Sequence, residues 1–382
     1  MSEPDWLPLT GFRVAVTSAR RAEELSALLR RRGATVTSAA AIAMVPLPDD
    51  DELRAHTHAL IGTPPDIVVA TTGIGLRGWI AAADGWGVAA DLTAALKRAR
   101  IVSRGPKATG ALRAAGLPEE WSPESESSRE VLRYLLDGGI AGKRIAVQLH
   151  GATDDWDPFP EFLDELRAAG ADVVPIRVYR WRPAPRNGEF DQLVTGIAEE
   201  KFDAVSFTSA PAVASVLMRA TEMGVADRVL SAMRTTVHAM CVGPVTARPL
   251  VRLGVPTSAP ERMRLGALAR HITDELPLLQ ARTLRVAGHL LEIRGTCVLV
   301  DGVVKSLSPA GMATIRALAH RPGSVVSRTD LLGALPGSGT DTHAVETAVL
   351  RLRTALGDKQ IVSTVVKRGY RLTVDDDLAG AL

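Results

Sequence analysis

The sequence contains little cysteine and no long apolar run. Only two of its 382 residues are cysteines, Cys241 and Cys297, so a disulfide framework is excluded and a cysteine-based metal site is not supported. No uninterrupted apolar run approaches the roughly 18 residues that a membrane-spanning helix needs, and no basic-then-apolar leader opens the chain. We therefore expect a cytoplasmic protein without a membrane partner, and we assign it no metal and no cofactor.

Charge is distributed unevenly along the chain. The formal net charge is only +2, but residues 282–372 hold 13 Lys and Arg against 6 Asp and Glu, whereas residues 1–281 hold 32 against 34. An acidic tail follows at residues 375–382. A basic module beside a near-neutral body is typical of a polyanion-binding domain fused to a domain of another kind. The length predicts two or three domains.

The basic region contains a helix pattern with two distinct faces. The segment 343-HAVETAVLRLRTALGD-358 has apolar residues at the i, i+3 and i+4 spacing of one buried face. The predicted buried residues are Val345, Ala348, Val349, Leu352 and Leu356. The opposite face carries His343, Thr347, Arg351 and Thr354, with Arg353 beside it.

A basic hairpin is predicted directly after this helix. The segment 361-IVSTVVKRGYRL-372 predicts two short strands around the turn Lys367-Arg368-Gly369. A winged helix binds DNA with this combination: the helix enters the major groove and the wing contacts the backbone or the minor groove. A winged helix that contacts only proteins is the alternative, and the basic charge of the region argues against it.

The preceding residues contain segments that occur twice in the same order. Short β-rich runs follow a glycine, later runs begin at Asp and end in small hydroxyl residues, and Gly-Pro segments carry Leu and Gly at equal offsets. The pairs are 11-GFRVAVTSAR-20 with 142-GKRIAVQLHG-151, 66-DIVVATTG-73 with 203-DAVSFTSA-210, and 105-GPKATGALRAAG-116 with 243-GPVTARPLVRLG-254. Strands alternating with helices predict two α/β lobes built on parallel sheets, with ligands bound at the carboxyl ends of the strands.

In this order the segments resemble uroporphyrinogen-III synthase over nearly all of residues 10–275. The strongest pieces are 203-DAVSFTSAPAV-213 and 241-CVGPVTARPLVRLGV-255. The resemblance implies an α/β, bilobal synthase-like fold at residues 1–275, in which a two-stranded linker joins the lobes and a cleft lies between them. The implied boundaries are about 1–43 and 180–275 for lobe one and 44–179 for lobe two, with the linker near Met44–Leu47 and Ile176–Tyr179.

The resemblance also implies a chemistry. The family's enzyme closes the linear hydroxymethylbilane into a macrocycle and inverts one pyrrole ring, with main-chain amides holding the carboxylates. The matching positions are Tyr179, Thr208, Ser209, Gly243 and Thr246, and the predicted strand ends add Thr71, Thr72, Gly73 and His150. The sequence departs from the family at Ala108, where the second repeat has Thr246, and at 71-TTGIG-75, where the family has T-S-x-N-G. These departures argue against turnover.

Several local patterns allow more than one interpretation. The stretch 73-GIGLRG-78 matches a dinucleotide fingerprint, but it follows a later strand, so we interpret it as a glycine-rich turn that exposes amides to anions. His150 is a ligand contact, a haem ligand or a structural residue. Arg20 and Arg21 are solvated helix ends or contacts to acidic ligand groups. No acidic pair follows 13-RVAVT-17, which argues against a phosphorylated receiver domain.

Residues 284–374 resemble the OmpR/PhoB type of winged helix over their whole length. Residues 284–309 match its N-terminal sheet, with turns at Gly295 and Asp301-Gly302, and Ser308 and Ser327 are expected N-caps of the first two helices. A linker is expected at 276–283. The assigned DNA-binding residues are Thr347 and Arg351 at base edges, Arg353 and Thr364 at phosphates, Lys367 or Arg368 in the minor groove, and His343 on the same face.

The whole architecture resembles actinobacterial regulators of nitrate and nitrite assimilation, which carry a synthase-like domain before a winged helix. We therefore expect a transcription regulator whose partner is a double-stranded DNA operator. Its synthase-like domain is expected to sense a tetrapyrrole or another small anionic effector, or to contact another regulator protein. The alternative is an active uroporphyrinogen-III synthase that also binds DNA.

Overall fold

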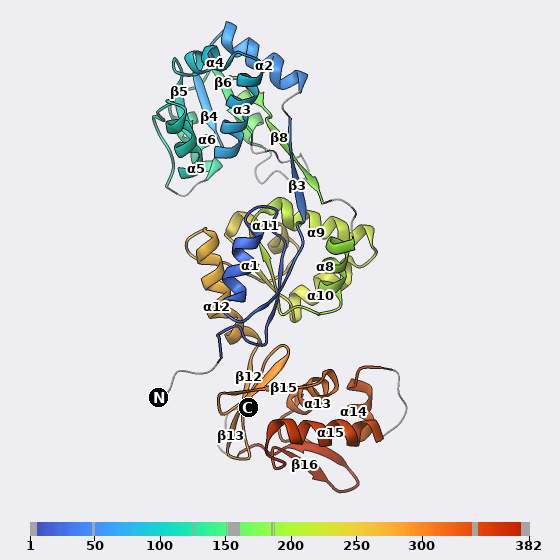
Figure 1. Ribbon diagram of the computed structural model, residues 1–382. Helices are drawn as coiled ribbons and strands as arrows, with labels where there is room; N and C mark the ends of the chain where they lie inside the picture. The colour runs from blue at the N-terminus through green and yellow to red at the C-terminus, as the bar shows by residue number, and fades with distance from the viewer. Residues whose placement is uncertain are drawn as a thin grey trace. The chain divides into compact units, whose positions relative to one another are not determined.

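The computed structural model describes residues 6–47, 50–124, 127–149, 151, 161–184, 186, 188–337 and 343–375. The chain divides into two compact units. The first contains residues 1–41 and 186–382, and the second contains residues 42–185. The helices and strands of each unit are labelled in Figure 1.

The first unit contains a parallel sheet with strand order β11-β10-β9-β1-β2. Helices cover both faces of the sheet (Figure 1), and the buried runs in β1 and β9 are accordingly apolar except for Ser206. Helices α1 and α12 share one core cluster with β1, whereas α8, α9 and α10 pack together. The strands are β1 (Arg13–Val16), β2 (Thr35–Ser38), β9 (Ala204–Phe207), β10 (His238–Cys241) and β11 (Thr257–Ser258). The helices are α1 (Ala22–Arg30), α8 (Gly188–Ala198), α9 (Ala210–Glu222), α10 (Ala226–Thr235), α11 (Pro244–Arg252) and α12 (Leu265–Gln280).

The second unit contains a parallel sheet with strand order β5-β4-β6-β7. Two apolar clusters lie on its two faces, one around Trp79 and the other around Leu132. The strands are β4 (Ile67–Ala70), β5 (Arg100–Ser103), β6 (Arg144–Gln148) and β7 (Asp172–Ile176). The helices are α2 (Asp51–Gly62), α3 (Gly73–Gly85), α4 (Ala89–Leu96), α5 (Pro106–Ala114), α6 (Ser128–Asp137) and α7 (Phe162–Ala168).

An antiparallel two-stranded ribbon also belongs to the second unit. It pairs β3 (Ile42–Pro46) with β8 (Tyr179–Pro183). The second linker strand was expected near Ile176–Tyr179, but it begins only at Tyr179. Ile176 is instead the last residue of β7, where it pairs with Gln148. The run from Asp172 to Pro183 contains no glycine, and only residues 177–178 separate the two strands. Periodicity therefore gave no signal for where one strand ends and the next begins.

The Gly-Pro repeats form the same local structure in both sheets. Each strand, β5 or β10, is followed by an extended glycine and a nine-residue helix with proline in its first turn. Each helix is then followed by a glycine with φ of +68°, Gly116 or Gly254. The predicted repeat is thus confirmed as a structural repeat. The stretch 73–78 differs from its interpretation as a turn, because it forms the first turns of α3.

The C-terminal part of the first unit is a winged helix. A four-stranded antiparallel sheet comes first, followed by three helices and a two-stranded wing. The strands are β12 (Arg282–Val286), β13 (His289–Ile293), β14 (Cys297–Val300), β15 (Val303–Ser306), β16 (Val362–Val365) and β17 (Gly369–Leu372). The helices are α13 (Pro309–His320), α14 (Arg328–Ala334) and α15 (His343–Leu356).

Two details of this part were expected and one was not. Ser308 accepts a hydrogen bond from the Gly311 amide and Ser327 accepts one from the Asp330 amide, which confirms both N-caps. The structure differs from the separate linker expected at 276–283, because α12 continues to Gln280 and β12 begins at Arg282. Within the described ranges, no helix combines the length and the apolar character needed to span a bilayer.

Candidate nucleic-acid interface and ligand-binding residues

Helix α15 separates a buried apolar face from an exposed polar one. All five predicted apolar residues, from Val345 to Leu356, are buried in the core of the winged helix. The polar residues expected on the opposite face, His343, Thr347, Arg351 and Thr354, are exposed. The 3.6-residue period therefore predicted both faces of this helix correctly.

Arg351 has its hydrogen-bond donors available to a ligand. Its side chain is exposed, and it makes no hydrogen bond or ion pair with another described residue. Thr347 lies one helical turn earlier on the same face and is also exposed. A guanidinium has five N–H donors in a planar fork, which suits the two acceptor atoms of guanine in the major groove.

Arg353, which we expect at a phosphate, also makes contacts within the winged helix. Its Nε and Nη2 atoms donate to the carbonyl oxygen of Val362 at 2.8 and 2.6 Å, and Nη2 donates to Oγ1 of Thr364 at 2.9 Å. Its guanidinium also lies 5.8 Å from the ring centroid of Tyr370. Arg353 thus joins α15 to both strands of the wing, and the Thr364 hydroxyl is engaged in this contact.

The wing ends in the predicted basic turn. Lys367 adopts a left-handed conformation with φ of 62°, and Lys367 and Arg368 are exposed. Gly369, with φ of 138°, lies so close to the segment before α14 that a Cβ atom would be 2.1 Å from the carbonyl oxygen of Val326. The glycine therefore lets the wing pack tightly while its two cations stay at the tip.

Glu346 is the acidic residue of α15, and two cationic or protonatable groups lie next to it. Its carboxylate is 3.7 Å from Nε of Arg328 and 3.4 Å from Nδ1 of His343. Pairs of this kind on the surface contribute little to stability, about 0–1 kcal/mol. They nevertheless offset part of the negative charge of this carboxylate on the exposed face of α15.

A second histidine, His289, connects two aspartates from different segments of the winged helix. His289 on β13 has Nδ1 at 2.5 Å from Asp301 and Nε2 at 3.2 Å from Asp358. The hydrogen bond to Asp301 raises the pKa of His289 above its ordinary value, and the bond to Asp358 adds to it. The same contact lowers the pKa of Asp301. This cluster joins the N-terminal sheet to the segment that follows α15.

In the second unit, the predicted residues Thr71, Thr72 and Tyr179 meet at the carboxyl ends of β4 and β6. The Thr72 hydroxyl lies 3.3 Å from the Tyr179 hydroxyl and accepts a hydrogen bond from the Gly75 amide, which caps α3. The Thr71 hydroxyl donates to the carbonyl oxygen of Gln148 at 2.6 Å. Gly73 is the first residue of α3, directly after this pair.

Gln148 organises this group, although the sequence pattern did not single it out. It is completely buried, and its Oε1 accepts from the Thr72 amide at 3.0 Å. A Cβ atom on Gly75 would lie 1.9 Å from its Nε2. A polar residue directly after the apolar run 145-IAV-147, at the end of β6, was the available signal. His150 lies outside the described residues.

In the first unit, the predicted residues also follow strand ends. Thr208 and Ser209 come between β9 and α9, and the Thr208 hydroxyl lies 3.1 Å from that of Ser18 after β1. Gly243 comes between β10 and α11, and Thr246 is buried in the first turn of that helix. Helices α9 and α11 therefore begin at the carboxyl edge of the sheet, where their first amides carry a partial positive charge.

Residues 23–270 match the protein family described as uroporphyrinogen-III synthase HemD. The chain belongs to this family. It is 30% identical over 261 residues to an uncharacterized protein, YjjA, of Bacillus subtilis (strain 168), a region that covers 68% of this chain and 94% of that protein. A crystal structure of a mutant uroporphyrinogen III synthase from the extremely thermophilic bacterium Thermus thermophilus is 30% identical, with a TM-score of 0.57, over 68% of this chain and 96% of that one. The bilobal fold expected from the sequence is thus confirmed.

The C-terminal part of the chain matches a second protein family. Residues 302–372 match the family described as transcriptional regulatory protein, C terminal. The transcriptional regulatory protein CutR of Streptomyces coelicolor is 33% identical over 111 residues, which make up 28% of this chain and 49% of CutR. The chain is therefore a fusion of a HemD-like part with an OmpR/PhoB-type DNA-binding domain, and this fusion supports a role as a DNA-binding regulator.

The HemD-like part departs from its own internal repeat at one site position. Ala108 on α5 occupies the place that Thr246 holds on α11, and both are buried. The Ser103 hydroxyl, at the end of β5, is 2.6 Å from that of Thr109. The second unit thus has no hydroxyl at position 108, although its main-chain geometry at Gly105 matches that at Gly243.

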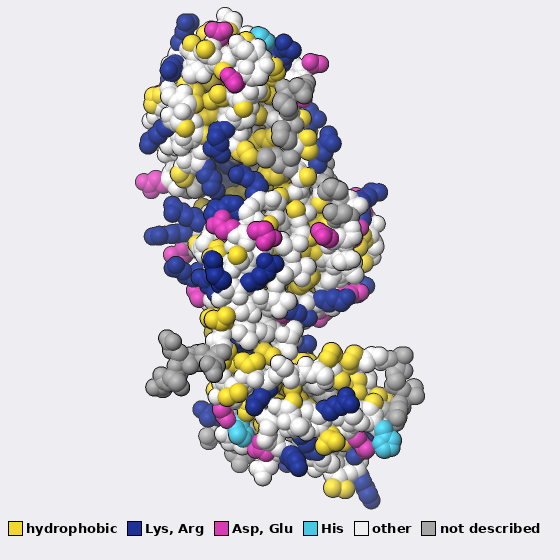
Figure 2. Space-filling model, in the orientation of Figure 1, with side chains coloured by type: hydrophobic (Ala, Val, Ile, Leu, Met, Phe, Trp, Pro, Cys, Tyr) yellow, Lys and Arg dark blue, Asp and Glu magenta, His cyan; other side chains and the backbone are white. Residues whose placement is uncertain are grey.

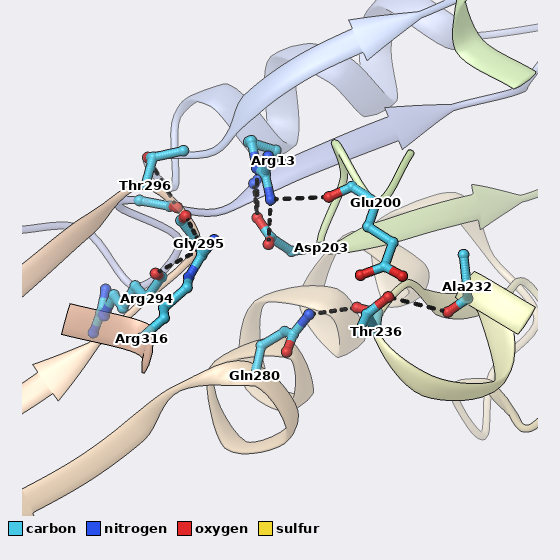
Figure 3. Close-up of polar contacts among 11 residues, drawn as sticks. Arg13, Glu200, Asp203, Ala232, Thr236, Gln280, Arg294, Gly295, Thr296 and Arg316 are labelled. Carbon is cyan, nitrogen blue, oxygen red and sulfur yellow. Dashed lines mark hydrogen bonds and ion pairs between the residues drawn. The ribbon is translucent and has the colours of Figure 1, made fainter. Parts of the chain in front are cut away.

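Within the first unit, the HemD-like sheet contacts the winged helix through its amino edge (Figure 3). Asp203, which is 3% exposed, accepts hydrogen bonds from the Arg13 amide at 2.7 Å and from the Arg13 guanidinium. Gly295, in the turn between β13 and β14, lies against this pair, and a Cβ atom there would be 2.2 Å from Oδ2 of Asp203. The neighbouring Thr296 donates from its amide to the Gly11 carbonyl oxygen at 2.7 Å.

Arg294, on the winged-helix side, contributes further hydrogen bonds to the same domain contact. It is only 3% exposed, and its Nη1 donates to the carbonyl oxygens of Pro8 and Thr10 at 3.3 and 3.0 Å. Its guanidinium lies 4.2 Å from the Trp6 ring centroid and is paired with Glu292 at 2.6 Å. A buried cation is tolerated here because its Nε and Nη1 donate hydrogen bonds and a carboxylate is adjacent.

Proposed function

We propose that this chain is a transcriptional regulator that reads an operator in double-stranded DNA through α15 and its wing. The observation that carries the proposal is the exposed α15 face with Thr347 and the guanidinium of Arg351, which is unpaired among the described residues, on a helix that Arg353 joins to the wing bearing Lys367 and Arg368. In a winged helix such a face enters the major groove and the wing follows the backbone or the minor groove. We assign Thr347 and Arg351 to base edges and the two wing cations to the backbone or minor groove.

The HemD-like part serves as the regulatory domain in this proposal. Its strand-end residues place helix N-termini and hydroxyl groups where an anionic ligand is favoured. A tetrapyrrole, whose periphery carries several carboxylates, fits these donors, and another small anionic effector or another regulator protein is the further candidate. Supporting contacts include Thr72 with Tyr179, and Ser18 with Thr208.

The contacts of β1 and β9 offer a physical route from such a ligand to the DNA-binding domain. Their carboxyl ends are followed by Ser18 and Thr208, whereas their amino ends carry Arg13 and Asp203. Gly295 of the winged helix packs against the latter pair. A ligand that shifts the strand ends would therefore act on elements that also form the domain contact.

The regulated genes that we propose are those of nitrate and nitrite assimilation. The proposal rests on the similarity of this architecture to regulators of that process and on a chemical link: uroporphyrinogen III is the branch point toward sirohaem, the cofactor of nitrite reductase. We expect calorimetry on the full chain to detect binding of a tetrapyrrole, nitrate or nitrite. If none of them binds, the sensor role fails and a protein-partner role remains.

An active synthase is the second candidate function, and membership of the HemD family favours it. The Tyr179 hydroxyl beside Thr72 and the buried Thr246 are compatible with a retained ligand site. Ala108 and the 71-TTGIG-75 segment weigh against turnover. We expect a coupled assay from porphobilinogen to give uroporphyrinogen I, the product of spontaneous closure. Formation of uroporphyrinogen III above the background of a heat-inactivated sample would establish the enzyme instead.

A further inference from the structure

A large apolar side chain lies on the DNA-facing surface of α15. Leu350 is 62% exposed, whereas Val349 and Leu352 on either side of it are 1% exposed. The sequence pattern did not single it out, because one leucine outside the buried stripe does not alter the period of the helix. Leu352 and Leu356 thus pack in the core of the winged helix, whereas Leu350 faces solvent.

The position of Leu350 on the helix is central to the exposed face. Successive residues of an α-helix are rotated by about 100°, so Leu350 lies close in direction to Thr354 and His343 and nearly opposite the buried Leu352. Thr347 precedes it by one turn, and Arg351 follows it directly. Leu350 therefore shares the exposed face with Thr347, which we assign to DNA, and with the paired carboxylate of Glu346.

The residues around Leu350 indicate which group of a ligand would contact its side chain. Single exposed leucines are common on protein surfaces and need no partner. This one precedes Arg351, whose donors are free among the described residues, on a helix that Arg353 joins to a wing carrying Lys367 and Arg368, and the nearby carboxylate of Glu346 is paired with Arg328 and His343. In Figure 2, basic, acidic, histidine and apolar side chains are interspersed over the part of the surface that α15 and the wing occupy. The one apolar group that a DNA major groove presents is the 5-methyl group of thymine.

We propose that Leu350 is a specificity-determining residue that contacts a thymine methyl group in the operator. Adjacent residues of the helix are separated by only about 1.5 Å along its axis, so this thymine lies next to the base pair that Arg351 reads. The inference rests on the proposed function of α15. It adds that the operator must contain an A·T pair beside the guanine and that this pair is recognised by an apolar contact.

The test uses the full chain and chemically altered operators. The operator is first selected from random double-stranded DNA, and each of its thymines is then replaced singly by deoxyuridine, which lacks only the methyl group. We expect one replacement beside the guanine to weaken wild-type binding about fourfold, the factor that corresponds to burial of one methyl-sized group. Leu350→Ala should bind the unaltered operator about fourfold more weakly and lose nothing further on the deoxyuridine operator.

Matched variants distinguish the possible results. Leu350→Met keeps an apolar side chain and should retain the methyl discrimination, whereas Leu290→Ala removes an exposed leucine from β13 and should bind like the wild type. If every deoxyuridine operator affects wild type and Leu350→Ala equally, or if selected sites lack thymine there, the inference is overturned while Arg351→Ala still loses binding. If Arg351→Ala also binds normally, the proposed function itself fails.

Discussion

Replacing Arg351 with alanine is expected to reduce sequence-specific operator binding by about 5- to 150-fold and to leave the fold intact. The guanidinium is exposed and has no described partner, so its removal leaves no buried group unsatisfied. Alanine is the best helix former, so α15 should keep its structure. A bidentate arginine–guanine contact contributes about 1–3 kcal/mol of discrimination. A gel-shift titration of operator against unrelated DNA measures this loss.

Two further arginines serve as controls for that result. Arg285→Ala removes the same charge from an exposed position of β12 and should bind operator with nearly unchanged affinity. Arg353→Ala should instead lower stability, because its guanidinium holds Val362 and Thr364 of the wing. An Arg351→Ala variant that binds the operator as tightly as the wild type would refute the assignment of α15 as the reading helix.

Periodicity and turn residues predicted the elements of this protein well. The buried face of α15, the serine caps of α13 and α14 and the two Gly-Pro repeats all depend on contacts within a few residues of sequence. Local physics fixes such features, so the sequence alone contains them. The predicted boundary between β7 and β8 was wrong, because the run contains no glycine to mark where one strand ends and the next begins.

The candidate sites were predicted less completely, for reasons of three-dimensional contact. Arg353 lies beside the exposed face, and only the position of Val362 shows that its donors point into the wing. Gln148 becomes important because β6 brings it next to Thr72, which is 76 residues away. Leu350 stands out only when its exposure is compared with that of its neighbours. Pattern reasoning identified the kind of surface but not the partner of each side chain.

The contact between the HemD-like sheet and the winged helix also depends on residues that are distant in sequence. Gly295 approaches Gly11 and Asp203, and a Cβ atom on it would lie 2.6 Å from the Gly11 carbonyl oxygen as well as 2.2 Å from the Asp203 carboxylate. Neither atom can withdraw easily, because the first belongs to the backbone and the second, Oδ2 of Asp203, accepts hydrogen bonds from the amide and Nε of Arg13 at 2.7 and 3.2 Å. The sequence showed Gly295 only as a turn residue.

We therefore expect Gly295→Ala to destabilise the full chain by about 1–3 kcal/mol, the usual cost of forcing an extra methyl group into a packed site. The free energy of unfolding from urea titration measures the effect.

Gly333→Ala is the matched control, because nothing lies within 4 Å of its added Cβ atom in α14. Alanine in a helix stabilises by about 0.5–1 kcal/mol relative to glycine. Equal unfolding midpoints for Gly295→Ala and the wild type would mean that this turn does not pack against Asp203. A midpoint lowered in Gly295→Ala and not in Gly333→Ala would show that Gly295 is needed for close packing, as the contact with Gly11 and Asp203 requires.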